Sequence, residues 1–76
     1  MNENRRERLN DCYDILQELI EKIEDIKNEE VGTFENMTEN LQKSEMGVAM
    51  QETIEYLGDA VLELEIVKTD IEAIQK

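Results

Sequence analysis

The chain has 76 residues, of which 20 are acidic and 8 are basic, so its formal net charge is -12. A charge of this sign argues against direct binding to nucleic acid or to an anionic membrane, and it favours basic or apolar protein surfaces as partners. The single cysteine and the absence of histidine exclude an internal disulfide and a Cys/His zinc site. No stretch has the length of a membrane span or of a signal-peptide core, so the expected location is the cytoplasm.

A first helix is predicted from about residue 2 to about residue 30, because no proline or glycine interrupts this stretch. Apolar residues recur there at alternating spacings of three and four, the heptad pattern of a helix that packs against another helix. The predicted seam consists of Leu9, Cys12, Leu16, Leu19, Ile23 and Ile26. Cys12 is interpreted as a small core residue, because the neighbouring carboxylates of Asp11 and Asp14 disfavour a reactive thiolate.

A chain reversal is predicted over residues 31–43. Gly32 is expected to end the first helix in the left-handed conformation, and Thr33 could cap a short helical turn after it. Ser44 is the expected N-cap of a second helix, with Glu45 near the positive end of the helix dipole.

The second helix is predicted from about residue 44 to about residue 75. Its seam consists of Leu57, Ala60, Leu64, Val67, Ile71 and Ile74, preceded on roughly the same side by Met46, Met50 and Ile54. Gly47 and Gly58 lie within this helix, where each glycine costs about 1 kcal/mol relative to alanine. Either another helix crosses closely at these glycines, or a long helix tolerates them, and the sequence leaves both interpretations open.

The two seams have similar lengths, so the predicted fold is all-α: a single-domain, coiled-coil-like antiparallel helical hairpin over residues 1–76. The chain carries more apolar surface than one hairpin can bury, which predicts a homodimer that forms a four-helix bundle. The residues expected to make the dimer contacts lie beside the seams, at Tyr13, Ile15, Ile20, Leu62 and Ile66.

The sequence contains no motif that predicts catalysis or cofactor binding. A phosphate-binding glycine loop, a nucleophile elbow and a zincin helix are all absent from it. Residues 28–39 are rich in glutamate, but they lack the alternating Asp/Asn positions and the central glycine of an EF-hand. We therefore expect a protein that is not an enzyme and has no metal or cofactor.

A row of acidic residues follows the first predicted helix on the face opposite its seam. Its members step by four and three positions along the chain: Glu7, Asp11, Asp14, Glu18, Glu21 and Asp25. At the helical rise, successive carboxylates lie about 4.5 to 6 Å apart along the axis, comparable with the phosphate spacing of a nucleic-acid strand. Two interpretations remain open: a nucleic-acid decoy that binds a basic protein, or a solvated face that keeps a small bundle in solution.

The run Ser44, Glu45, Gly47, Ala49, Met50, Gln51 and Glu52 forms a Ser-Glu-x-Gly-x-Ala-Met-Gln-Glu motif. With this motif the segment 36–54 resembles small acidic helical proteins of uncharacterised function from phages, prophages and Firmicute mobile elements. Those proteins carry a leucine-proline turn before the run, where this chain has Met37 and Thr38. The resemblance implies a mobile-element origin and, for a phage-encoded protein, the host cytoplasm; it implies no catalytic or binding residues.

The predicted function is that of a non-catalytic acidic protein-interaction module. In its sharpest form this is a phage-encoded inhibitor of a host defence or nucleic-acid-binding protein, acting through the acidic row. The alternative is a structural or assembly adaptor that pairs with partner helices through apolar contacts. Salt separates the two, because screening weakens charge pairing and leaves apolar contacts intact.

Overall fold

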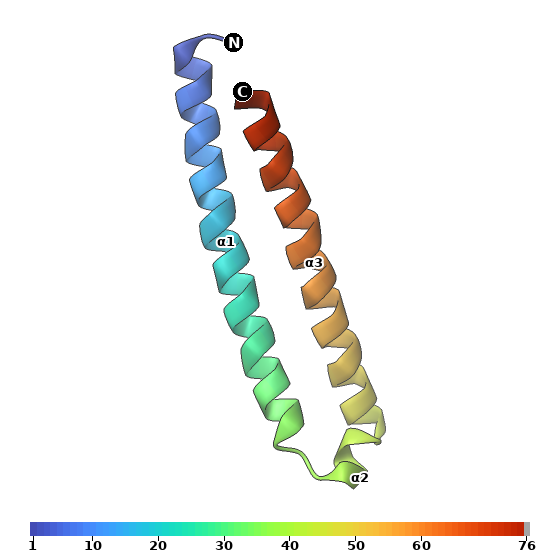
Figure 1. Ribbon diagram of the computed structural model, residues 1–76. Helices are drawn as coiled ribbons and strands as arrows, with labels where there is room; N and C mark the ends of the chain where they lie inside the picture. The colour runs from blue at the N-terminus through green and yellow to red at the C-terminus, as the bar shows by residue number, and fades with distance from the viewer. Residues whose placement is uncertain (76) are drawn as a thin grey trace.

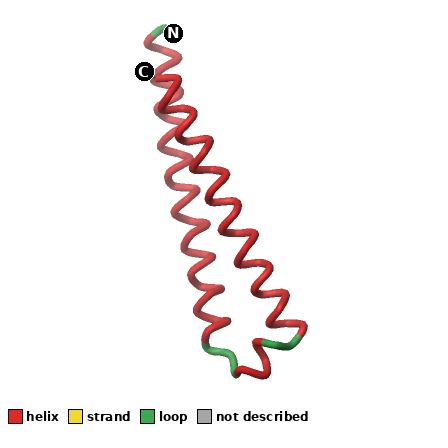
Figure 2. Tube along the Cα trace, turned by 45° about the vertical axis from the view of Figure 1, so that its right-hand side comes forward, coloured by secondary structure: helices red, strands yellow, loops and turns green. Residues whose placement is uncertain are grey.

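The computed structural model describes residues 1–75 and contains helices α1 (Glu3–Glu35), α2 (Glu39–Gln42) and α3 (Glu45–Gln75). The helices α1 and α3 lie side by side and run in opposite directions, and α2 lies in the turn at one end (Figure 1). A second view shows the two chain ends together at the opposite end (Figure 2). The Cα trace measures 58 × 15 × 13 Å. The predicted all-α fold is confirmed, as a hairpin of two long helices.

Helix α1 begins at an asparagine cap. Asn2 has extended backbone angles, and its side-chain oxygen accepts a hydrogen bond from the backbone N–H of Arg5 at 2.9 Å. This bond satisfies one of the amide groups that have no partner within the first helical turn. Glu3 follows in that turn, where a negative charge interacts favourably with the helix dipole.

The prediction that Gly32 ends the first helix is wrong. Helix α1 continues through Gly32 to Glu35, and no residue from 1 to 75 has a positive φ. The extra turn places the half-buried side chains of Val31 and Phe34 against α3. Burial of these side chains outweighs the cost of one helical glycine, which is about 1 kcal/mol.

The turn is held by a cap on α2 and a bond back to α1. The side chain of Thr38 accepts a hydrogen bond from the Leu41 amide at 3.3 Å, so Thr38 caps the short helix. The expected cap, Thr33, instead lies within α1, and its hydroxyl donates to the carbonyl of Glu29 at 3.1 Å. Gln42 donates from its side chain to the carbonyl of Phe34 at 3.0 Å. This bond ties α2 to the end of α1.

Helix α3 begins at Glu45, directly after Ser44. The Ser44 hydroxyl accepts a hydrogen bond from the amide of Gly47 at 3.3 Å, as an N-cap does. Gly47 is buried, and a Cβ atom at this position would overlap the backbone carbonyl oxygens of Leu41 and Gln42. Of the two interpretations open for this glycine, the structure therefore favours a close approach, made here by α2.

The seam between the two long helices consists of partly or fully buried residues that alternate at spacings of three and four. In α1 they are Leu9, Tyr13, Leu16, Ile20, Ile23, Lys27, Glu30 and Phe34. In α3 they are Gly47, Met50, Ile54, Leu57, Val61, Leu64, Lys68, Ile71 and Gln75. Ile20 is 1% exposed and is the one fully buried apolar side chain in residues 1–75. These residues are the a and d positions of a heptad repeat in each helix.

The predicted seam is only half correct. Its d positions, among them Leu16 and Leu64, lie in the observed seam. Its other members are exposed, to 42% at Leu19, 53% at Ile26, 43% at Val67 and 54% at Ile74, and Cys12 is exposed as well. Ala60 is half-buried beside the seam. On each helix, apolar residues occupy the a, d and g positions of the heptad. Two helices pack against each other only through the a and d positions, so the g residues stay outside the seam.

Candidate interaction surfaces

Polar contacts between α1 and α3 follow one side of the seam, which we call the polar side. The hydroxyl of Tyr13 donates to a carboxylate oxygen of Glu72 at 2.5 Å, and the ammonium group of Lys68 donates to the side-chain oxygen of Gln17. Gln17 follows Tyr13 by four positions in α1, whereas its partner Lys68 precedes Glu72 by four positions in α3. The helices are therefore antiparallel in a fixed register.

Lys68 has three partners at this side of the seam. Besides Gln17, its ammonium nitrogen lies 3.6 Å from a carboxylate oxygen of Glu65 and 5.3 Å from the centre of the Tyr13 ring. The Lys68 side chain is 17% exposed. These partners replace water around a side chain that is largely covered.

The pKa of Tyr13 is raised above the ordinary tyrosine value of 10.0. The largest cause is the hydrogen bond to Glu72, which only the neutral phenol can donate, followed by partial burial. The negative charges of Glu72, Glu65 and Asp14 disfavour the phenolate further. Tyr13 is therefore a neutral hydrogen-bond donor up to high pH.

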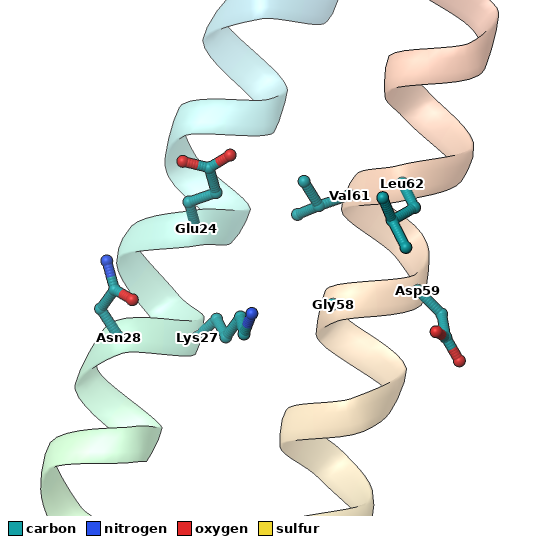
Figure 3. Close-up of a pocket in the computed structure, with 7 residues that line it drawn as sticks. All are labelled: Glu24, Lys27, Asn28, Gly58, Asp59, Val61 and Leu62. Atoms are coloured by element: carbon teal, nitrogen blue, oxygen red, sulfur yellow. The ribbon is translucent and has the colours of Figure 1, made fainter.

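The polar side also contains a shallow groove between the helices, drawn in Figure 3. It has a volume of about 450 Å³, and the Lys27 side chain extends across it toward Gly58. A Cβ atom at Gly58 would meet the Lys27 ammonium at 3.5 Å, an ordinary contact, so this glycine is tolerated rather than required. The lining side chains are carboxylates, an amide, one ammonium and two aliphatic groups.

The opposite side of the seam, which we call the apolar side, is formed by the g positions of both helices. In an antiparallel pair the g positions of the two helices face the same way, just as the e positions share the polar side. Because Gln17 is level with Lys68, the g residues of α1 lie beside those of α3 at nearly the same height. The apolar side consists of Cys12, Leu19, Ile26, Ala60, Val67 and Ile74.

All six residues of the predicted acidic row are exposed on α1. They occupy the b and f positions, which face away from α3 and from the apolar side. Within residues 1–75, the two ion pairs are Lys43 with Glu39 and Lys68 with Glu65, so none involves the row. Its one side-chain bond is from Gln17 to Glu21, at 3.0 Å. The row is thus a line of carboxylates on one unbroken helix, and no basic side chain among the described residues forms an ion pair with it.

The five residues predicted to make the dimer contacts do not share a surface. Tyr13 and Ile20 lie in the seam of the hairpin itself, and this corrects their assignment as contacts between two chains. Ile15, Leu62 and Ile66 are each more than 60% exposed. Leu62, however, lines the groove on the polar side, and Ile66 occupies the f position on the outer face of α3.

The sequence contains a signal for the apolar side that the seam prediction missed. The e positions are polar at Asn10, Gln17 and Glu65, whereas the g positions at matching heights are apolar. A helix pair with one polar and one apolar flank presents a surface for a further helix layer. The sequence analysis placed these g residues in the seam between the two helices, so it did not predict an exposed apolar side.

In residues 1–75, no group of three or more cysteine or acidic side chains is placed to hold a metal ion. Over the same residues, neither long helix has the length of apolar sequence that crossing a membrane requires. Comparison with protein-family models, with curated proteins and with solved structures found no match to this chain. The functional inference therefore depends on the two long surfaces, the acidic row and the apolar side.

Proposed function

We propose that this chain is a non-catalytic, acidic protein-interaction module that acts as a homodimeric four-helix bundle. One observation carries the proposal: six exposed carboxylates follow one face of α1 and form no ion pair within residues 1–75. Such a row attracts basic groups along the length of the helix, because no lysine or arginine of residues 1–75 forms an ion pair with it. The partner that fits it is a protein surface with a line of lysine or arginine side chains.

The sharpest form of the proposal is inhibition of a nucleic-acid-binding protein. Such a protein presents basic groups spaced to meet phosphates, and the carboxylate spacing along the row is of the same order, about 4.5 to 6 Å along the helix axis. A phage-encoded inhibitor of a host defence protein would fit the mobile-element origin that the Ser44–Glu52 motif implies. Binding of this kind weakens steeply as salt rises.

The second candidate function is a structural or assembly adaptor that pairs with partner helices. The exposed apolar side favours it, because heptad-spaced aliphatic residues at matching heights on two helices are what another helix packs against. Binding through this side would survive high salt, since it depends on apolar burial. The first candidate therefore predicts binding that is lost at high salt, and the second predicts binding that is retained.

The experiment is affinity capture from a Firmicute lysate, the host class that the resemblance implies, at low and high salt. The immobilised chains are the wild type and a row variant with Asp11→Asn, Asp14→Asn, Glu18→Gln and Asp25→Asn. The matched control neutralises four exposed carboxylates on α3, with Glu52→Gln, Asp59→Asn, Glu63→Gln and Asp70→Asn. Both variants change the net charge equally, so they separate the position of the row from total charge.

The proposal predicts a protein captured by the wild type and by the α3 control at low salt, and lost with the row variant. DNA added to the lysate should release the same protein. Capture that both variants retain at high salt would contradict a role for the row and favour the adaptor. Equal loss with both variants would show that bulk charge, and not the row, attracts the partner.

A further inference from the structure

We infer that the apolar side of the hairpin is the surface on which a second copy of this chain docks, apolar side against apolar side. The inference deepens the proposed homodimer by assigning its interface, and it does not depend on the acidic row. It replaces the contacts that the sequence predicts with g positions of both helices, centred on Leu19 and Val67.

The apolar side has the form of a helix-packing surface. Leu19 and Val67 are 42% and 43% exposed, and Ile26 and Ile74 are 53% and 54% exposed. Each is separated by seven residues from the next g residue on its helix, so the aliphatic groups form two parallel lines along the hairpin. A partner that covers both lines must itself be long and straight, as a second helical hairpin is.

The distribution of charge favours a second copy of the chain, rather than a basic protein, as the partner of the apolar side. The g positions from Cys12 to Ile26 and from Ala60 to Ile74 carry no ionised side chain, although the chain as a whole has a charge of -12. A basic surface docked on these g residues would lose water without gaining a carboxylate among them, since the nearest carboxylates, Glu63 and Asp70, lie at the neighbouring c positions. A second hairpin instead brings the same uncharged stripe, and face-to-face docking leaves both acidic rows on the outside, in water.

The hairpin alone buries too little apolar surface for a chain of this size. Within residues 1–75, one apolar side chain, Ile20, is fully buried, whereas twelve large hydrophobic side chains are exposed. Chains this short fold stably when a disulfide, a metal or self-association adds to the core. The lone Cys12 rules out an internal disulfide and residues 1–75 contain no metal-ligating cluster, which leaves a partner that is always present as the source of the missing burial. A second copy meets that condition.

The size and position of the apolar side also fit a dimer. The hairpin is 58 Å long and 15 Å across, whereas the apolar side spans about 21 Å at the helical rise of 1.5 Å per residue, so an interface of the standard 800 Å² per partner would extend from the apolar side onto the residues around it. Leu19 lies at the midpoint of α1. On α1 the apolar residues are therefore central, with polar residues at the g positions toward both ends, Arg5 and Thr33, as in the usual arrangement of an interface.

The test is the molar mass of the full chain at tens of micromolar, measured by light scattering after gel filtration at low and high salt. The variants are Leu19→Gln and Val67→Gln on the apolar side, with Ile66→Gln as the control. Ile66 is the neighbour of Val67 and is more exposed, at 62%, but it faces outward. Circular dichroism checks that each variant remains helical.

The inference predicts about twice the 8.9 kDa chain mass for the wild type and for Ile66→Gln, and the single-chain mass for helical Leu19→Gln and Val67→Gln. High salt should strengthen the dimer, because it screens repulsion between two acidic chains. If a variant on the apolar side unfolds, urea melts of the wild type test the dimer instead. The urea midpoint of a dimer must rise with protein concentration.

A wild-type chain of single mass in both salts, or a urea midpoint independent of concentration, would overturn the inference. Dissociation by Ile66→Gln to the same extent as by Val67→Gln would overturn the choice of face. The row variant of the capture experiment should remain a dimer. Failure of the dimer and failure of the acidic row to bind a partner are thus measured separately.

Discussion

Lys68 lies across the seam from Tyr13, with its ammonium nitrogen 5.3 Å from the centre of the aromatic ring. The same tyrosine donates its hydroxyl hydrogen to Glu72, and Lys68 donates to Gln17. These contacts join residues more than 50 positions apart, and they occur on one side of the seam only. They fix the register of the hairpin, whose other side is formed by the g residues of both helices.

The Tyr13 contact predicts a loss of stability at high pH. The folded-state pKa of Tyr13 is raised, so the tyrosine stabilises the fold fully below its unfolded pKa of about 10. This contribution disappears as pH rises through the folded pKa, because the phenolate can no longer donate to Glu72. Urea melts of the wild type and Tyr13→Phe should therefore differ at pH 8, and the difference should shrink progressively as the pH rises above 10. A difference that grows as the pH rises above 10 would show that the hydrogen bond is not responsible.

The same isoleucine-to-alanine substitution should lower the free energy of unfolding by very different amounts inside and outside the seam. Ile20→Ala removes the one fully buried aliphatic side chain in residues 1–75 and should lower the free energy of unfolding by about 2 to 4 kcal/mol. Ile66→Ala changes a residue that is 62% exposed on the outer face of α3 and should cost well below 1 kcal/mol. Urea melts measure both. Equal costs would mean that Ile20 does not occupy the core of the hairpin.

The glycines predict effects of opposite sign. Gly47→Ala should destabilise the fold by about 2 kcal/mol, because its Cβ atom would overlap two carbonyl oxygens of the neighbouring turn. Gly32→Ala should stabilise it by about 0.5 to 1 kcal/mol, since Gly32 is helical and no atom lies within 4 Å of the added Cβ. Thermal melts followed by circular dichroism compare the two. A destabilising Gly32→Ala would indicate that α1 ends at Gly32 in solution.

The sequence predicted the helical hairpin because its d positions, such as Leu16 and Leu64, belong to every heptad seam that the pattern allows. It did not distinguish the a positions from the g positions, since both are largely apolar in this chain. Lys27 and Lys68 occupy a positions, where their aliphatic stems pack in the seam, and the charged end of Lys68 reaches Gln17 on the other helix. Hydropathy alone excludes lysines from a seam, so the sequence pattern did not identify these positions.

The end of α1 was mispredicted for a related reason. Gly32 has the right identity for a helix end, and local propensity gives no reason for the helix to continue. The helix continues because Phe34 packs on α3 and because its carbonyl accepts a bond from Gln42. Both are contacts with segments that follow the turn, so single-helix patterns do not contain them.

The acidic row was predicted residue by residue, because it depends only on the period of one helix. All six carboxylates lie on the exposed face of α1. The partner of the row stays a prediction.

The most direct measurement is the affinity between the wild-type chain and the protein it captures, determined by titration calorimetry over a series of salt concentrations. The proposed function predicts an affinity that falls steeply with salt, is retained in the α3 control and is lost in the row variant. An affinity that is independent of salt and equal for the wild type and the row variant would contradict it.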